Sequence, residues 1–136
     1  DPTPGRRGSA MAQILVCDDE PLFQALVRSA LTQDGHQVTC VDSAEALFAE
    51  TGRATYDAVV CDLIMPDCDG LEVIRRLKAS TGAPRLLSIS AGMGGELQTT
   101  LLNAARALGA DAILAKPFTP AQLRAAVAPL CQPDCP

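Results

Sequence analysis

Hydrophobic and polar positions follow two alternating patterns along most of the chain. Short, continuous apolar runs are typical of buried parallel strands, and longer stretches with an apolar residue every three or four positions are typical of amphipathic helices. The short runs predict strands at residues 13–17, 38–41, 58–61, 85–90 and 112–115. The longer stretches predict helices at residues 21–33, 43–50, 71–80, 97–108 and 120–128.

Capping residues mark several helix ends. Asp42, with Glu45 three positions later, gives an N-terminal signal for the second helix. Thr119 and Gln122 form a capping box for the last helix, and Gly109 follows the fourth. The first helix carries a broad apolar stripe that we expect to face the core: Leu22, Phe23, Leu26, Val27, Ala30 and Leu31. The apolar positions of the last two helices are also interpreted as core: Ala104, Ala105, Leu108, Ala121, Leu123 and Val127.

Five strands alternating with five helices predict a (βα)5 unit. Parallel strands need crossover helices, and right-handed crossovers place helices on both faces of the sheet, so we expect a doubly wound α/β fold. Such sheets bind ligands at the carboxyl ends of their strands. We expect one domain at residues 13–130, a disordered leader or cloning remnant at residues 1–12, and a tail at residues 131–136.

Composition narrows the class of protein. The 136 residues carry a formal net charge of −5, and 48% of them are hydrophobic. That apolar content excludes a disordered chain, and no run approaches the roughly 18 residues that span a membrane. The acidic balance argues against direct nucleic-acid binding, which depends on cations at the phosphates.

The six cysteines do not read as a disulfide framework. Cys17, Cys40 and Cys61 lie in or beside apolar strands, where a free thiol behaves as a small buried hydrophobe. Residues 1–10 contain no apolar run of the signal-peptide kind, so we expect a reducing cytoplasm.

The remaining cysteines leave alternatives open. Cys68 is interpreted as an incidental loop residue rather than a redox sensor, because no neighbouring basic residue is evident to activate its thiol. Cys131 and Cys135 could form a disulfide or half a metal site, although a frayed tail is the favoured interpretation. His36, the one histidine, follows the first helix at the opposite end of the fold, so no zinc site is expected.

Charged and hydroxyl side chains gather at the predicted strand ends. The first strand runs into Asp18 and Asp19, the third ends at Asp62, the fourth at Ser90 and the fifth at Lys116. Carboxylates held about 4 Å apart repel by roughly 4 kcal/mol at an effective dielectric of 20, unless a cation joins them. Oxygen ligands of this kind suit Mg²⁺, and a lysine opposite suits a phosphate oxygen. The residues therefore predict phosphoryl transfer to a carboxylate.

Four segments in this order make the chain resemble a receiver domain of two-component response regulators. They are ILVCDDEP, VVCDLIMPDCDGLEVI, SISA and LAKPF, within residues 13–130. The resemblance implies a flavodoxin-like sheet with strand order 2-1-3-4-5. It also implies that the chain is a phosphorylation-switched signalling domain rather than an enzyme acting on other substrates.

The resemblance implies a role for each matched residue. Asp62 is then the phosphoacceptor, and Asp18, Asp19, Asp62 and the backbone carbonyl of Ile64 are the protein ligands of Mg²⁺. Ser90 matches the switch hydroxyl of the family.

Lys116 matches the family lysine, and its bond to Pro117 is a candidate for the cis form. The implied phosphodonor is a sensor histidine kinase or a histidine phosphotransfer protein. The new phosphate then draws Ser90 inward and pairs with Lys116, which alters a face made by the fourth helix, the fifth strand and the fifth helix.

Three departures from the family pattern stand out. Ile113 occupies a position that is aromatic in most receivers. The span of 26 positions from Ser90 to Lys116 is about four longer than in common receivers. The glycine-rich segment at residues 91–95 is expected to carry the extra length, either as harmless variation or with a partner-specific role. Ile64 and Gly92 stand where many relatives carry polar groups, so we expect slower hydrolysis of the acyl phosphate.

Other functions fit the residues less well. A haloacid dehalogenase-like hydrolase needs an aspartate two residues after its nucleophile, where this chain has Ile64. A flavodoxin-like flavin carrier needs a hydroxyl- and glycine-rich loop after the first strand, where this chain has three acids. A pseudo-receiver is disfavoured because the acid, hydroxyl and lysine set is complete. The output is open: a stand-alone regulator and a piece of a longer protein both fit.

Overall fold

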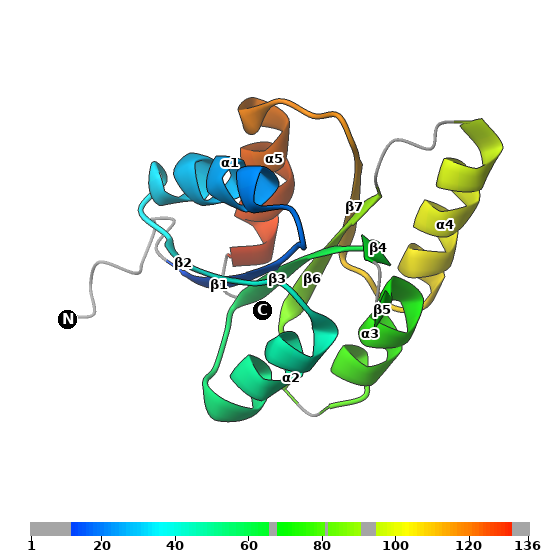
Figure 1. The fold of residues 1–136 in the computed structure, drawn as a ribbon, viewed down its shortest axis with the longest axis horizontal. Coiled ribbons are helices and arrows are strands. Elements are labelled where there is room, and N and C mark those ends of the chain that lie inside the picture. The colour runs from blue at the N-terminus through cyan, green and yellow to red at the C-terminus, as the bar shows by residue number, and fades with distance from the viewer. Residues whose placement is uncertain (1–11, 66–67, 81, 91–94, 132–136) are drawn as a thin grey trace.

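The computed structural model describes residues 12–65, 68–80, 82–90 and 95–131, without the side chains of residues 68 and 95. Within them, strands and helices alternate largely as the apolar pattern predicts (Figure 1). The predicted leader, apart from Ala12, and residues 132–136 of the predicted tail lie outside the described residues. The elements in chain order are β1 (Gln13–Cys17), α1 (Pro21–Thr32), β2 (Gln37–Val41), α2 (Ala44–Arg53), β3 (Ala58–Asp62), β4 (Ile64–Met65), β5 (Cys68–Asp69), α3 (Gly70–Lys78), β6 (Arg85–Ser90), α4 (Gly95–Ala107), β7 (Ala112–Ala115), α5 (Pro120–Val127) and the 3-10 helix η2 (Ala128–Cys131).

The five long strands form one parallel sheet in the order β2-β1-β3-β6-β7. Counted along the chain, these strands have the order 2-1-3-4-5, so the predicted doubly wound α/β fold is confirmed. A short antiparallel hairpin, β4 with β5, stands between β3 and α3, in a segment for which no strand was predicted. The hairpin changes the numbering of the later strands and leaves the sheet order as expected.

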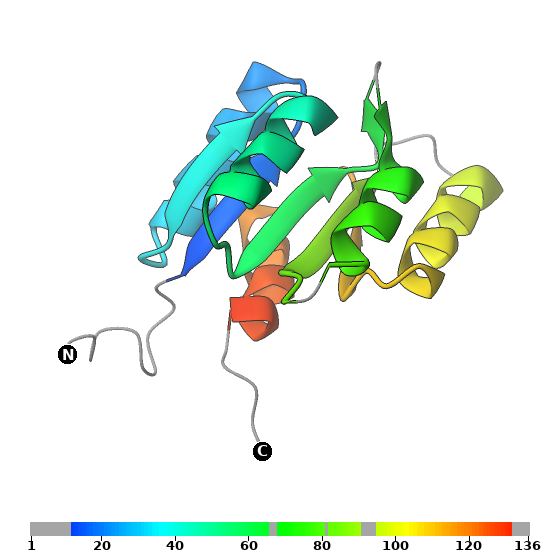
Figure 2. The same cartoon turned by 90° about the horizontal axis from the view of Figure 1, so that it is seen from below.

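Helices cover both faces of the sheet (Figures 1 and 2). Alternate strand residues point to opposite faces, which divides the apolar interior in two. The first core lies against α2, α3 and α4, and its buried residues are Leu15, Cys17, Leu47, Tyr56, Val59, Cys61, Leu63, Met65, Val73, Ile74, Leu77, Leu86, Ala105 and Ala110. The second core lies against α1 and α5, and its buried residues are Ala12, Ile14, Val16, Val27, Ala30, Leu31, Ala58, Val60, Leu87, Ile89, Leu123, Val127 and Leu130.

Capping chemistry sets the helix ends, with one correction. The N-cap of α2 is Ser43, whose hydroxyl accepts a hydrogen bond from the Ala46 N–H, and not the predicted Asp42. The reason is that β2 continues to Val41 and Ser43 keeps an extended backbone, so the helix begins one residue later. The helix also continues to Arg53, past the predicted end at Glu50.

The capping box of α5 is confirmed. The Thr119 hydroxyl accepts from the Gln122 N–H, and the Gln122 side chain accepts from the Thr119 N–H. Gly109 has a φ of +120°, a conformation that favours glycine, as expected for the residue that ends the turn after α4.

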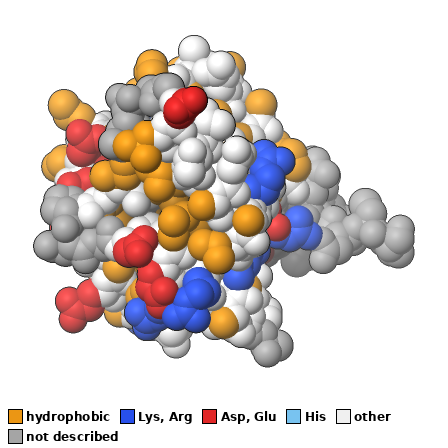
Figure 3. All heavy atoms as spheres, turned by 90° about the vertical axis from the view of Figure 1, so that its right-hand side faces the viewer, with side chains coloured by type: hydrophobic (Ala, Val, Ile, Leu, Met, Phe, Trp, Pro, Cys, Tyr) orange, Lys and Arg blue, Asp and Glu red, His pale blue; other side chains and the backbone are white. Residues whose placement is uncertain are grey.

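Part of the predicted core is exposed. Leu22 is 87% exposed and Leu26 is 41% exposed, because only the Val27, Ala30 and Leu31 side of α1 faces the sheet. Leu108 and Ala121 are also exposed, contrary to prediction. Leu97 on α4, which was not assigned to the core, is exposed as well. Figure 3 views the right-hand side of Figure 1, where α4 lies and hydrophobic side chains gather.

Candidate functional site

Three carboxylates meet at the carboxyl end of the sheet. Asp18 directly follows β1 and Asp62 ends β3, and these neighbouring strands are in register, with Cys17 opposite Cys61. The register brings both acids to the same edge, and Asp19 follows Asp18 there. The ligand oxygens of Asp18, Asp19 and Asp62 all lie within 4.8 Å of one another. Asp18 and Asp62 are buried, whereas Asp19 is exposed.

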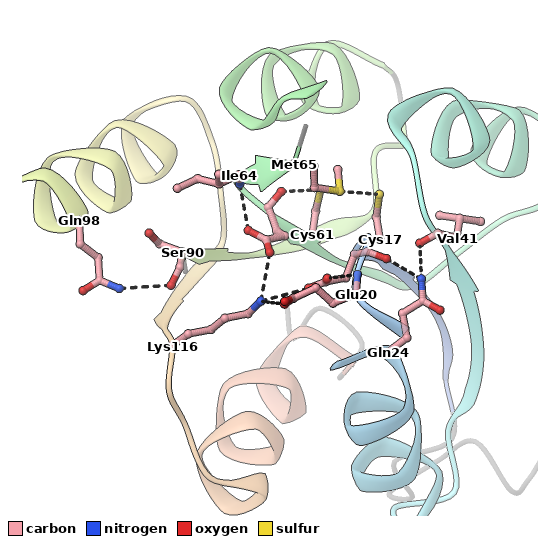
Figure 4. Close-up of polar contacts among 12 residues, drawn as sticks. Cys17, Glu20, Gln24, Val41, Cys61, Ile64, Met65, Ser90, Gln98 and Lys116 are labelled. Carbon is pink, nitrogen blue, oxygen red and sulfur yellow. Dashed lines mark hydrogen bonds and ion pairs between the residues drawn. The ribbon is translucent and has the colours of Figure 1, made fainter. Parts of the chain in front are cut away.

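Lys116 reaches these carboxylates from the loop after β7 (Figure 4). Its Nζ lies 3.1 Å from Asp62 Oδ2 and 3.3 Å from Asp18 Oδ2. It also lies 3.3 Å from Glu20 Oε1. The bond from Lys116 to Pro117 is cis, as predicted. One ammonium group therefore bridges acids from two different strand ends.

Burial and charge act against each other in this cluster. Burial raises the pKa of the Asp18 carboxyl above its ordinary value, and the neighbouring Asp62 carboxylate acts in the same direction. The Glu20 N–H and Lys116 partly offset these effects. Burial lowers the pKa of Lys116, but the Asp62 and Asp18 carboxylates outweigh burial and leave it above its ordinary value. The lysine therefore stays protonated at neutral pH.

Backbone amides orient the two buried acids. The Ile64 N–H donates to Asp62 Oδ1 at 2.9 Å, while the other oxygen of Asp62 contacts Lys116. The Glu20 N–H donates to Asp18 Oδ1 at 2.9 Å. Each carboxylate thus has one oxygen held by the backbone and one by the ammonium, which defines its rotation.

Ser90 is buried at the end of β6, beside the carboxylate edge. Its carbonyl oxygen accepts hydrogen bonds from the Lys116 N–H at 2.9 Å and from Gln98 Nε2 at 3.2 Å. Gln98 belongs to α4, so this one carbonyl links the end of β6 to β7 and to α4 (Figure 4). The predicted glycine-rich loop, including Gly92, lies outside the described residues up to Gly95, where α4 begins.

Three residues at the site were not predicted to belong to it, although Phe23 was predicted to face the core. Glu20 contacts Lys116, and the Phe23 ring centroid lies 3.8 Å from the same ammonium. The Gln24 side chain donates to the backbone carbonyls of Asp18 and Val41. All three lie at the start of α1. Pro21 at the first helical position predicts where this helix begins, but it gives no information on which residues its side chains contact.

The cysteines and the histidine of the described residues do not belong to the cluster of carboxylates and lysine. Cys17 and Cys61 are buried, as predicted, whereas Cys40 is only partly buried. Cys131 carries a free thiol and a pKa that burial raises to about 11; its possible partner Cys135 lies outside the described residues. His36 is buried before β2, at the opposite end of the strands.

The arrangement suits chemistry on an anionic group. A buried carboxylate, a neighbouring acidic pair and a protonated lysine provide a nucleophile, cation ligands and a counter-charge within one cluster. A metal ion could be held where three or more Asp, Glu, Cys or His side chains come together. Among the residues that the structure describes, only Asp18, Asp19 and Asp62 form such a group.

Comparison with known proteins places this chain in a family. A family model described as the response regulator receiver domain matches residues 14–128. The chain is 36% identical over 117 residues to the transcriptional regulatory protein TcrA of Mycobacterium tuberculosis, covering 85% of this chain and 45% of that protein. It is 30% identical over 111 residues to the sensory/regulatory protein RpfC of Xanthomonas campestris, covering 82% of this chain and 15% of that protein.

A solved structure shows the same fold. A putative response regulator from Chloroflexus aurantiacus superimposes with a TM-score of 0.80 at 24% identity, covering 88% of this chain and 97% of that one. The chain spans less than half of the length of TcrA and RpfC. No helix in the described part of the chain has the length and apolar character needed to cross a bilayer.

Proposed function

Because this chain belongs to the response regulator receiver family, whose domains receive phosphoryl groups from histidine kinases, we propose that Asp62 is its phosphoacceptor. The observation that carries the proposal is the position of Asp62 at the end of central strand β3. There its side chain is 3% exposed and contacts Lys116, and an acidic pair adjoins it. The domain is a signalling module, and we infer that it acts on no external substrate beyond the phosphodonor.

The residues define how the transfer proceeds. A carboxylate oxygen of Asp62 attacks the phosphorus of a phosphohistidine, the N–P bond breaks, and the imidazole of the donor keeps the electron pair. The product is an acyl phosphate on Asp62. The Lys116 ammonium, 3.1 Å from Asp62 Oδ2, lies where it can neutralise a phosphoryl oxygen. The Ile64 N–H holds the other carboxylate oxygen.

Asp18, Asp19 and Asp62 fit a divalent cation, which we propose is Mg²⁺. Their ligand oxygens lie within 4.8 Å of one another, and carboxylate oxygen is a ligand that Mg²⁺ prefers. We propose the backbone carbonyl of Ile64 as the remaining protein ligand. Bound Mg²⁺ supplies positive charge that offsets the charge on the phosphoryl oxygens.

Ser90 and Lys116 provide the proposed switch. Phosphorylation places three acceptor oxygens on Asp62, which attract the Lys116 ammonium and the Ser90 hydroxyl. The Ser90 carbonyl accepts hydrogen bonds from the Gln98 side chain and from the backbone N–H of Lys116. A shift of Ser90 is therefore transmitted to α4 and to the end of β7. The surface of α4, β7 and α5 is therefore the proposed output face.

The proposed partners follow from this chemistry. The phosphodonor is a sensor histidine kinase or a histidine phosphotransfer protein, and the output partner is another protein or domain. We propose that the module works in the cytoplasm, since Cys17, Cys40 and Cys131 are free thiols.

The assignment of Asp62 is tested by labelling with acetyl phosphate. We expect the wild-type chain to be labelled in the presence of Mg²⁺ and Asp62→Asn to show no label, because the amide is not a nucleophile for phosphorus. Asp34→Asn, which changes an exposed acid beside Arg124, is the matched control and keeps full labelling. Full labelling of Asp62→Asn would overturn the assignment.

The metal proposal is tested at Asp19, the exposed member of the acidic group. We expect Asp19→Asn to weaken Mg²⁺ binding at least tenfold in isothermal titration calorimetry, since removing one charged ligand leaves the cation poorly neutralised. Asp34→Asn again serves as control. Equal Mg²⁺ affinity in Asp19→Asn and wild type would contradict the ligand set.

A further inference from the structure

An aromatic ring contacts the ammonium of Lys116. The Nζ lies 3.8 Å from the centroid of the Phe23 ring, well inside the roughly 6 Å over which a cation is attracted to an aromatic face. The Lys116 side chain is 13% exposed, so this contact is largely shielded from water. Shielding strengthens such an interaction, because water competes less for the cation.

The ring itself is held in place. Phe23 and Phe118 pack edge to face, with centroids 5.4 Å apart and an interplanar angle of 79°. Both rings also pack against the second core. Phe23 belongs to α1, and Phe118 lies between β7 and α5, two residues after Lys116. This packing restricts the rotation of the Phe23 ring.

The other partners of Lys116 are not constant. On the proposed function, Asp62 receives the phosphoryl group and Asp18 turns to a metal ion, while Glu20 is 66% exposed to competing water. Phe23 can accept neither a metal nor a phosphoryl group. Among the described side chains that contact the ammonium, the Phe23 ring is therefore the one whose attraction for it persists through the reaction.

We propose that Phe23 is a positioning residue that holds the Lys116 ammonium beside Asp62. The inference rests on the proposed function and adds to it a contact from α1. The aromatic partner of this site comes from α1, whereas β7 contributes Ile113 at its second position. Positioning lowers the cost of aligning the ammonium with the incoming phosphoryl group.

The contact is tested by nuclear magnetic resonance of lysine side chains. The chain has two lysines, and Lys78 pairs with Asp111 elsewhere, so it serves as an internal reference. In ¹³C-lysine-labelled protein we expect the ε-methylene protons of Lys116 to be shifted upfield by the ring. We expect Phe23→Leu to abolish this shift, Phe23→Tyr to retain it, and Lys78 to stay unchanged in both. An unchanged Lys116 shift in Phe23→Leu would overturn the proposal.

The functional consequence is tested by the rate of acetyl phosphate labelling. We expect Phe23→Leu to be roughly three- to tenfold slower than wild type and Phe23→Tyr to restore the rate. In a Lys116→Met background, Phe23→Leu causes no further loss, because the ring acts through the ammonium. Equal losses in both backgrounds would show a merely structural role and overturn the proposal. Failure of wild-type labelling would refute the proposed function instead, and the lysine shift reports the contact independently of labelling.

Discussion

At the scale of single residues, the site is a balance between repulsion and one shared cation. Asp18 and Asp62 are buried beside each other, and both contact the same Lys116 ammonium. Burial raises the pKa of Asp18, which means that its charged form is costly in this environment. The lysine offsets that cost but cannot remove it, because its one positive charge is shared among the carboxylates of Asp18, Glu20 and Asp62. The cluster is therefore poised to accept a further cation.

Cys131 gives a residue-scale prediction about pH. Burial raises the pKa of its thiol to about 11 in the folded chain, from an ordinary value of 9.0. Below pH 8 the thiol is neutral in both folded and unfolded chains. Between pH 9 and 11 it ionises only when the chain unfolds, so its contribution to the free energy of unfolding is lost as pH rises. We expect a loss of about 1–2 kcal/mol by pH 10.5.

The measurement compares wild type with Cys131→Val by urea unfolding at pH 8 and pH 10.5. Other titrating groups are common to both proteins and cancel in the difference. The wild type should lose stability relative to the variant at the higher pH. A difference that is equal at both pH values would show that the folded thiol titrates normally.

At the scale of elements, the start of α3 is confined by the turn before it. A Cβ added to Gly70 would lie 2.5 Å from the Cα and carbonyl oxygen of Leu63. These are backbone atoms, which cannot rotate away as a side chain can. The absence of a side chain at Gly70 therefore lets α3 begin directly against the segment that follows Asp62.

Two glycine substitutions test this confinement. We expect Gly70→Ala to lower the free energy of unfolding by about 1–3 kcal/mol, through the overlap with Leu63. Gly52→Ala, in the last turns of α2 with no atom within 4 Å of the added carbon, is the matched control. It should raise stability by about 0.5–1 kcal/mol, because alanine favours helix. Urea unfolding measures both, and a Gly70→Ala variant as stable as wild type would rule out the close approach.

The elements also show what the sequence could and could not predict. Strand positions followed from apolar runs, and the doubly wound arrangement followed from crossover rules, which are local or nearly universal. The strand order came from the resemblance to the receiver family. The choice of Ser43 as the N-cap of α2 could not be predicted, because Asp42 and Ser43 both suit an N-cap and only the end of β2 decides between them. The exposure of Leu22 was missed because periodicity indicates the centre of an apolar stripe but not its width.

The same distinction holds at the candidate site. Asp18, Asp62 and Lys116 could be placed together because each comes directly at or after a strand end of a predictable sheet. Glu20 and Phe23 could not, since their contacts with Lys116 depend on how α1 packs beside the loop after β7. That packing joins residues more than ninety positions apart, which periodicity along the chain does not encode.

At the scale of the whole molecule, the Ser90 carbonyl joins the site to helix α4. Gln98 of α4 and the Lys116 N–H share this acceptor. We expect beryllofluoride with Mg²⁺, a stand-in for the phosphoryl group, to change amide hydrogen exchange several-fold in α4, β7 and α5. Exchange in α2, on the far side of the site, should change little. The Asp62→Asn variant should not respond, and a response centred on α2 would contradict the proposed output face.

The separation of the interior into two cores has a consequence for how such a chain can change over generations. The parallel sheet separates the two cores, with the first core against α2, α3 and α4 and the second core against α1 and α5. Substitutions on opposite faces of the sheet share few neighbouring residues, so their effects on the free energy of unfolding should be additive. One side can then accumulate new residues while the other stays as it is. A lineage could in this way alter what meets α1 without disturbing what meets α4.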